Sequence, residues 1–120
     1  MNGPVQSAEL LPLGVDGVLV RVSRHLSEEA NALAISFGDR VRDAGIAGVT
    51  EVAASLVSVR IGFDPERTTR AALTATLKAL LDGRQTADAG PRRLWRIPAA
   101  FGPTYAPQLQ EAAALAGLTP

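Results

Sequence analysis

The sequence contains no cysteine and one histidine, which removes most familiar catalytic and metal-binding chemistry. Without cysteine there are no disulfides, thiolate nucleophiles, zinc–sulfur sites or iron–sulfur clusters. A serine triad would need His25 as its base, and the chain has no nucleophile-elbow sequence to go with it. We therefore expect no catalytic residue, no bound cofactor and no metal site in this chain.

Net charge, long apolar runs and a leader sequence are lacking as well. Twelve basic and twelve acidic side chains cancel, so no overall field favours nucleic acid or an anionic membrane. No apolar run approaches the length of a membrane-spanning helix, and residues 1–9 lack the charged start and apolar core of a secretion signal. These absences predict a cytoplasmic chain with no nucleic-acid and no membrane partner.

The residues that are present alternate in strand and helix periods. Apolar residues at every second position predict strands at 18–23, 49–53 and 56–63. A last short strand is predicted at 94–98, where proline closes the strand or lies at a sheet edge. The glycines at 14 and 17 predict a turn before the first strand, and 84–92 is predicted to be a mobile loop.

Helix signals fall between these strands. Ser27 is a good N-cap for an amphipathic helix that ends at Gly45, and Thr68 or Thr69 caps a second helix that stops near Gly83. The resulting β-α-β-β-α-β order is the split βαβ arrangement of ferredoxin-like folds. We therefore predict an α+β chain with a ferredoxin-like N-terminal domain at 1–98, whose two helices cover one face of the sheet.

The last part of the chain, 99–120, is predicted to be a connector loop followed by a short helix at 107–116. Gly117 suits the end of that helix, and Thr119 and Pro120 are the residues that favour the start of another one. A start signal at the end of the chain predicts the front part of a longer protein, with a further domain behind it.

A possible partner interface combines two groups of residues. Arg21, Ser58 and Arg60 are predicted to share the open face of neighbouring strands, where the arginines either bind an anion or a partner's carboxylates, or are simply solvated charges. Phe101 and Tyr105 lie in a turn-rich segment, which is either an interface loop or a packed connector. These five residues are the candidate interface.

Other polar residues are assigned structural roles. His25 is predicted to lie at the surface or near a helix cap, and Asp64 before a proline is predicted to be a turn residue. The glycines at 14 and 17 precede a strand, which is the wrong place for phosphate binding. One tryptophan beside the arginines at 92, 93 and 96 is weak evidence of stacking on nucleic acid.

Several short stretches follow one another over nearly the whole chain: LLPLGVD at 10–16, LSEEAN at 26–31, GVTEV at 48–52, Ser58, FDP at 63–65, RIP at 96–98, FG at 101–102, APQL at 106–109 and AGLTP at 116–120. In this order they resemble the KipI/PxpB family, whose members include 5-oxoprolinase and allophanate hydrolase subunits. The chain departs from the family at Ala54 and Leu56, where a proline and an aromatic are common, and at Ala106 and Gln108.

The resemblance implies a two-domain parent, in which a ferredoxin-like domain precedes a cyclophilin-like domain of the carboxyltransferase type. Many members are subunits of a bacterial ATP-dependent 5-oxoprolinase, which opens 5-oxoproline to glutamate, and others belong to allophanate hydrolases. The implied partners are the chain's own C-terminal domain and a second carboxyltransferase-type subunit, with ATP used by the parent complex. The family's GFxPGF, RxxPR and PGGW signatures lie in the second domain, and none occurs here.

Three kinds of function stay open at this point. The first is a non-catalytic domain of a 5-oxoprolinase-like or allophanate hydrolase-like complex. The second is a regulatory module that inhibits a sensor histidine kinase, as the resemblance also implies. The third is a free-standing ligand-binding domain, which needs a pocket that the sequence does not reveal.

Overall fold

The computed structural model describes residues 8–83, 91 and 93–120, and within these ranges it contains a four-stranded antiparallel sheet. The strands are β1 (Glu9–Leu13), β2 (Gly17–Arg21), β3 (Val49–Ala54) and β4 (Ser58–Phe63). Their order across the sheet is β1-β2-β4-β3, so β1 and β3 are the two edges. The chain is therefore α+β, as predicted.

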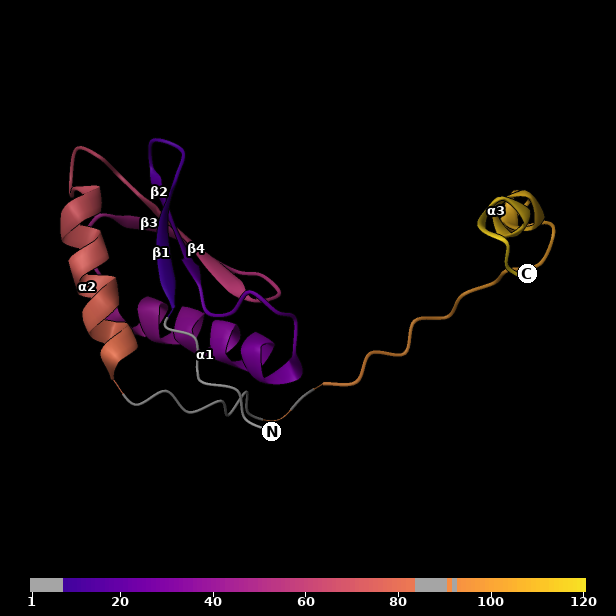
Figure 1. The fold of residues 1–120 in the computed structure, drawn as a ribbon, viewed down its shortest axis with the longest axis horizontal. Coiled ribbons are helices and arrows are strands. Elements are labelled where there is room, and N and C mark those ends of the chain that lie inside the picture. The colour runs from indigo at the N-terminus through magenta and orange to yellow at the C-terminus, as the bar shows by residue number, and fades with distance from the viewer. Residues whose placement is uncertain (1–7, 84–90, 92) are drawn as a thin grey trace.

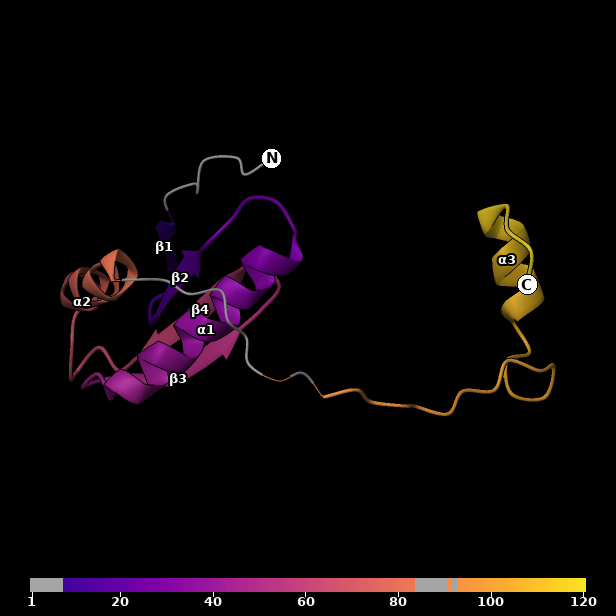
Figure 2. The same cartoon turned by 90° about the horizontal axis from the view of Figure 1, so that it is seen from below.

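Two helices, α1 (Glu28–Ala44) and α2 (Arg70–Asp82), pack on the sheet. Helix α1 lies against β3 and β4, and α2 lies against β1 and β2 (Figures 1 and 2). The Ser27 hydroxyl accepts a hydrogen bond from the Ala30 amide at 3.1 Å, and Gly45 ends α1 in the left-handed conformation. Thr69 caps α2 in the same way, which confirms the predicted helices and selects Thr69 over its neighbour.

The core lies between the helices and one face of the sheet. Residues of β2 and β4 alternate between this face and the open face, as the period of a strand requires. Helix residues at three- and four-residue steps complete the core. Its buried members are Val18, Val20, Val22, Ala34, Phe37, Val41, Val59, Ile61, Phe63, Leu73, Leu77 and Leu81.

The prediction of a strand at Leu94–Pro98 is wrong, because this segment has no strand partner and its apolar side chains are exposed. The place beside β2 is taken by β1, for which no strand was predicted. Only three residues join β1 to β2, and closing such a short loop costs little chain entropy compared with bringing in a distant segment. The predicted mobile loop at 84–92 lies outside the described residues, apart from residue 91.

We call residues 8–83 the body and residues 94–118 the arm. The arm extends away from the body (Figures 1 and 2). It ends in helix α3 (Leu109–Ala116), which confirms the predicted helix with a start two residues later. The radius of gyration is 19.4 Å, whereas a compact domain of this length has about 14 Å. The arm exposes Leu94, Trp95, Ile97, Phe101, Tyr105, Leu115 and Leu118.

Within the described ranges, no helix is both long enough and apolar enough to span a membrane. Helix α3, the most apolar in composition, has eight residues, and Ala113 is its one buried residue. Its N-cap, Gln108, makes no capping hydrogen bond through its side chain. The helix therefore depends on contacts outside itself for most of its stability, since isolated helices this short are marginal in water.

Asn31 ties α1 to the hairpin between β3 and β4. Its side-chain amide donates a hydrogen bond to the Leu56 carbonyl at 2.9 Å. We expect Asn31→Ala to lower the free energy of unfolding by about 1 kcal/mol, which urea unfolding followed by circular dichroism would measure. Asn31→Asp keeps the shape but loses the donor, so it should be no more stable than the alanine variant. A stability equal to the wild type in both variants would show that the bond contributes nothing.

Candidate partner interface

Arg21, Ser58 and Arg60 lie together on the open face of the sheet. Arg21 is paired with Ser58 in the register of β2 and β4, and Arg60 is paired with Leu19 two residues away. Their strand neighbours Val20 and Val59 are fully buried on the helix side, so the three polar residues face the other way. The predicted placement of these three residues is confirmed.

Arg21 is bound to an acidic residue of β1 for which no role was predicted. Glu9, in β1, is paired with Arg21 in the register. The Arg21 Nε donates to Glu9 Oε2 at 2.7 Å, and Arg24 binds the other carboxylate oxygen. The hydrogen bond from Arg24, with that from Arg21, lowers the pKa of Glu9 from its ordinary 4.5 to about 2, and raises the pKa of Arg24.

Arg60 has two acidic neighbours of its own. Its guanidinium forms an ion pair with Glu51 of the edge strand β3, and its Nη2 lies 3.6 Å from Asp16 Oδ1 in the turn between β1 and β2. The open face therefore carries two ion-paired groups, one around each arginine. An incoming anion would have to compete with carboxylates already in place, and exposed pairs of this kind contribute little stability.

A stripe of apolar side chains lies beside these charged groups, on β1 and β2. Leu11 of β1 is paired with Leu19 of β2, and Leu13 is 38% exposed at the end of β1. A surface that mixes ion pairs with half-exposed leucines suits a protein partner better than a small anion, because the polar rim and apolar centre both find counterparts. The partner-interface role of Arg21, Ser58 and Arg60 stays a prediction.

The lowered pKa of Glu9 makes the stability depend on pH. A carboxyl whose pKa is lower in the folded chain contributes stability above its unfolded pKa and loses it as the pH falls through the folded value. Unfolding temperatures should therefore drop between about pH 4.5 and 2, and Glu9→Gln should flatten this part of the profile. Glu111→Gln, which makes the same change in α3, is the control. Parallel profiles for Glu9→Gln and the wild type would contradict the prediction.

Phe101 and Tyr105 are not brought to the open sheet face. Both are in the arm, where 68% and 77% of their surfaces are exposed. The amides of Tyr105 and Ala106 donate to the Gly102 carbonyl at 3.0 and 2.9 Å, so a tight turn holds this part of the arm before α3. The five candidate residues thus fall into two separate places, one on the body and one on the arm (Figure 1).

The structural roles predicted for single polar residues are confirmed. His25 is exposed, and its amide donates to the Ser23 hydroxyl at 3.0 Å. The Asp64 carboxylate accepts a hydrogen bond from the Glu66 amide at 2.9 Å, as expected in a turn. Just before the arm, the Arg93 guanidinium lies 5.4 Å from the centre of the Trp95 ring, and residue 92 lies outside the described ranges.

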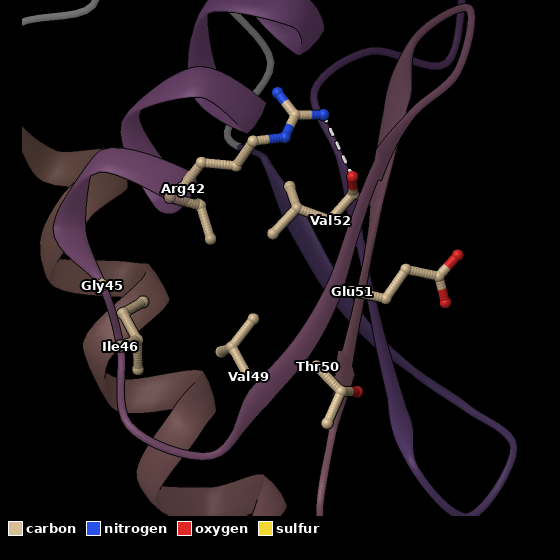
Figure 3. A pocket seen from close by; sticks show the side chains of 8 residues that line it. Arg42, Gly45, Ile46, Val49, Thr50, Glu51 and Val52 are labelled. Atoms are coloured by element: carbon tan, nitrogen blue, oxygen red, sulfur yellow. Dashed lines mark hydrogen bonds between the residues drawn. The ribbon is translucent and has the colours of Figure 1, made fainter.

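A groove of about 290 Å³ lies where the end of α1 meets β3 (Figure 3). Apolar side chains form most of its wall, and the Arg42 guanidinium crosses one end to donate to the Val52 carbonyl at 3.0 Å. The groove is lined by Val41, Arg42, Gly45, Ile46, Val49, Thr50, Glu51 and Val52. Sequence reasoning missed it, because no local pattern shows that β3 is an edge strand with a helix end above it.

Among the described residues, no three histidine, aspartate or glutamate side chains gather closely enough to hold a metal ion. The carboxylates of Glu9, Asp16 and Glu51 are each paired with an arginine.

Comparisons with known proteins give the chain a family. The model of the family described as "Carboxyltransferase domain, subdomain C and D" matches residues 8–120. No curated protein matches the sequence significantly. Among solved structures, the chain is similar to the conserved uncharacterized protein PH0987 from Pyrococcus horikoshii, with a TM-score of 0.58 and 19% identity. At this identity the likeness shows the fold alone.

That similarity covers 61% of this chain and 34% of the Pyrococcus protein, so the chain corresponds to about a third of that protein's length. The family match is more extensive, because it includes the body and the arm together. The chain belongs to the carboxyltransferase domain C and D family, the domain that is found in proteins of the KipI, PxpB and allophanate hydrolase subunit 1 group.

Proposed function

We propose that this chain is a non-catalytic, assembly-forming part of a subunit in a bacterial ATP-dependent 5-oxoprolinase or allophanate hydrolase-like complex. The family match over residues 8–120 is the observation that carries the proposal. In the 5-oxoprolinase case, the parent complex would open 5-oxoproline to glutamate in the cytoplasm, and ATP would be bound and used elsewhere in that complex.

The distribution of side chains supports an assembly role. The body offers the two ion-paired groups and the leucine stripe, whereas the arm exposes aromatic and aliphatic side chains that a folded protein normally covers. Aromatic residues such as Phe101 and Tyr105 are the kind that dominate binding energy at protein interfaces. We infer that the arm binds either the chain's own C-terminal domain or a second carboxyltransferase-type subunit.

We also infer that the body is a variant of the ferredoxin-like fold. Helices α1 and α2 each follow a central strand and lie on one face of the sheet, which is the split βαβ arrangement. In this variant β1 takes the edge position beside β2 that the predicted last strand would have filled.

The proposal is tested by mixing the chain with the second carboxyltransferase-type subunit of a 5-oxoprolinase and measuring complex formation by calorimetry. We expect a complex, no turnover of 5-oxoproline by the chain alone, and a loss of affinity of at least about tenfold for Phe101→Ser or Tyr105→Ser. Leu26→Ser is the matched control, because Leu26 is as exposed as Phe101 but lies on the body.

The absence of any complex with that subunit would contradict the proposal. The same preparation would then be added to a sensor histidine kinase. Inhibition of the kinase's autophosphorylation by the chain alone would favour the regulatory alternative, in which Arg60→Glu should weaken inhibition if the open sheet face makes the contact. Neither result affects the inference that follows, which depends on the groove and the arm alone.

A further inference from the structure

The outer edge of β3 offers backbone groups that do not pair with β4. The Ser55 amide donates to the Ser58 carbonyl at 2.8 Å, which sets the alternation of bonded pairs along the hairpin. By this alternation, the amide and carbonyl of Val52 point away from β4. The Arg42 guanidinium confirms the direction, because it reaches the Val52 carbonyl from α1 (Figure 3). Thr50 stands at a register shift and has no residue opposite it in β4.

The groove lies directly beside this edge, on the helix side of the sheet. Val49 and Val52 are half-buried against the core. Ile46, two residues after the end of α1, packs beside them. Glu51 points to the other side, where it is bound to Arg60. A strand added next to β3 would therefore place alternate side chains in the groove and the others beside Glu51.

The opposite edge of the sheet is less suitable for such an addition. Pro12 is the fourth of the five residues of β1, and proline has no amide to donate to a further strand. Prolines at edges are one of the devices that keep sheets from pairing with other chains. Of the two edges, the β3 edge is therefore the better acceptor, and an added strand there would take the place of Arg42 at the Val52 carbonyl.

The arm contains a segment with matching properties at Leu94–Pro98. Trp95 and Ile97 are two positions apart in an extended stretch, so they share one face, and they are 72% and 82% exposed. Arg96 lies on the opposite face. When Trp95 and Ile97 face the groove, Arg96 faces the side of the sheet that carries Glu51, where it would share this carboxylate with Arg60.

The exposed area is larger than a lone molecule of this size requires. The chain exposes 8967 Å², whereas a compact monomer of 12.5 kDa exposes about 6,200 Å². A standard interface buries about 800 Å² on each partner, which is a fraction of this excess. In addition, the arm runs away from its own sheet in both views (Figures 1 and 2).

From these observations we propose that the edge of β3 and its groove bind the segment 94–98 of a second copy of this chain. Trp95 and Ile97 occupy the groove, and the segment continues the sheet of the partner as a fifth strand. Each copy has one arm and one groove, so a reciprocal exchange closes a two-fold symmetric dimer without leaving either site open.

Cross-linking tests which residues meet, and the absence of native cysteine makes the background clean. A chain with Ile97→Cys is mixed with a chain with Ile46→Cys under mild oxidation. We expect a mixed disulfide product of two chains, well above the amount formed when Leu118→Cys replaces Ile97→Cys. No excess over this control would overturn the proposal. An internal disulfide in one chain that carries both Ile46→Cys and Ile97→Cys would also overturn it, because the arm would then bind its own body.

Trp95 is the one tryptophan of the chain, so its fluorescence reports on the arm. We expect the mass from light scattering to double and the emission to move to shorter wavelength together as the concentration rises. Ile97→Asp should raise the dissociation constant of the dimer at least about tenfold, and Leu118→Asp should leave it unchanged. A monomer at all concentrations overturns the proposal, whether its emission is that of a buried or of an exposed tryptophan.

Discussion

Phe37→Ala is expected to lower the free energy of unfolding by about 3–5 kcal/mol, the largest effect of any single side-chain truncation in the body. Phe37 is fully buried in α1 and is the largest of the fully buried side chains. Its ring also lies 5.5 Å from the Arg40 guanidinium, whose Nε and Nη2 are buried without a hydrogen-bond partner. Removal of the ring therefore leaves a cavity and takes away a favourable neighbour of a partly buried cation.

Urea unfolding followed by circular dichroism at helix wavelengths measures this loss. Tryptophan fluorescence is the wrong probe, because Trp95 is exposed in the arm and does not report on the core. Ile35→Ala in the same helix is the control, since Ile35 is 38% exposed and its truncation should cost less than about 1.5 kcal/mol. A loss below that value for Phe37→Ala would show that the helix interface collapses around the missing ring.

The helices were predictable because their signals are local. Ser27 and Thr69 bind the third amide after themselves, and Gly45 adopts the left-handed conformation that ends α1. None of these contacts depends on a distant residue. The apolar spacing that follows each cap then identifies the buried face, so the core positions of α1 and α2 follow from the same pattern.

The edge strand beside β2 was not predictable in the same way. Segments 9–13 and 94–98 both contain alternating apolar residues and a proline, and a pattern of this kind does not show which of them joins β2. The choice depends on chain connectivity: the turn of three residues after Leu13 brings β1 to β2 at little entropic cost. The segment at 94–98 retains its strand pattern but lies outside the sheet.

The candidate interface was predictable in part for related reasons. Arg21 and Arg60 were placed on one face because strand period alone determines the side to which they point. Their acidic partners Glu9 and Glu51 come from the two edge strands, so they become visible only when the strand order is known. The groove at α1 and β3 depends on the same tertiary information.

Gly48 is a second position where one added carbon is expected to have a large effect. It lies in the turn before β3 with a φ of +85°, a conformation that side chains rarely adopt. A Cβ at this position would lie 2.7 Å from Thr68 Cγ2, closer than real contacts allow. Its carbonyl also accepts a hydrogen bond from the Asp64 amide at 2.8 Å, which holds the turn against the segment before α2.

We expect Gly48→Ala to lower the free energy of unfolding by about 3 kcal/mol, as the sum of backbone strain and steric overlap. Gly45→Ala separates these two contributions, because Gly45 has a φ of +56° but no atom within 4 Å of an added Cβ. It should cost about 1 kcal/mol, from strain alone. Thr68→Ala should restore part of the stability of Gly48→Ala, since it removes the overlapping methyl and leaves the cap at Thr69 intact. Equal losses for the two glycine variants would mean that Thr68 moves aside freely, and the segment before α2 would then be softer than its contact with Gly48 indicates.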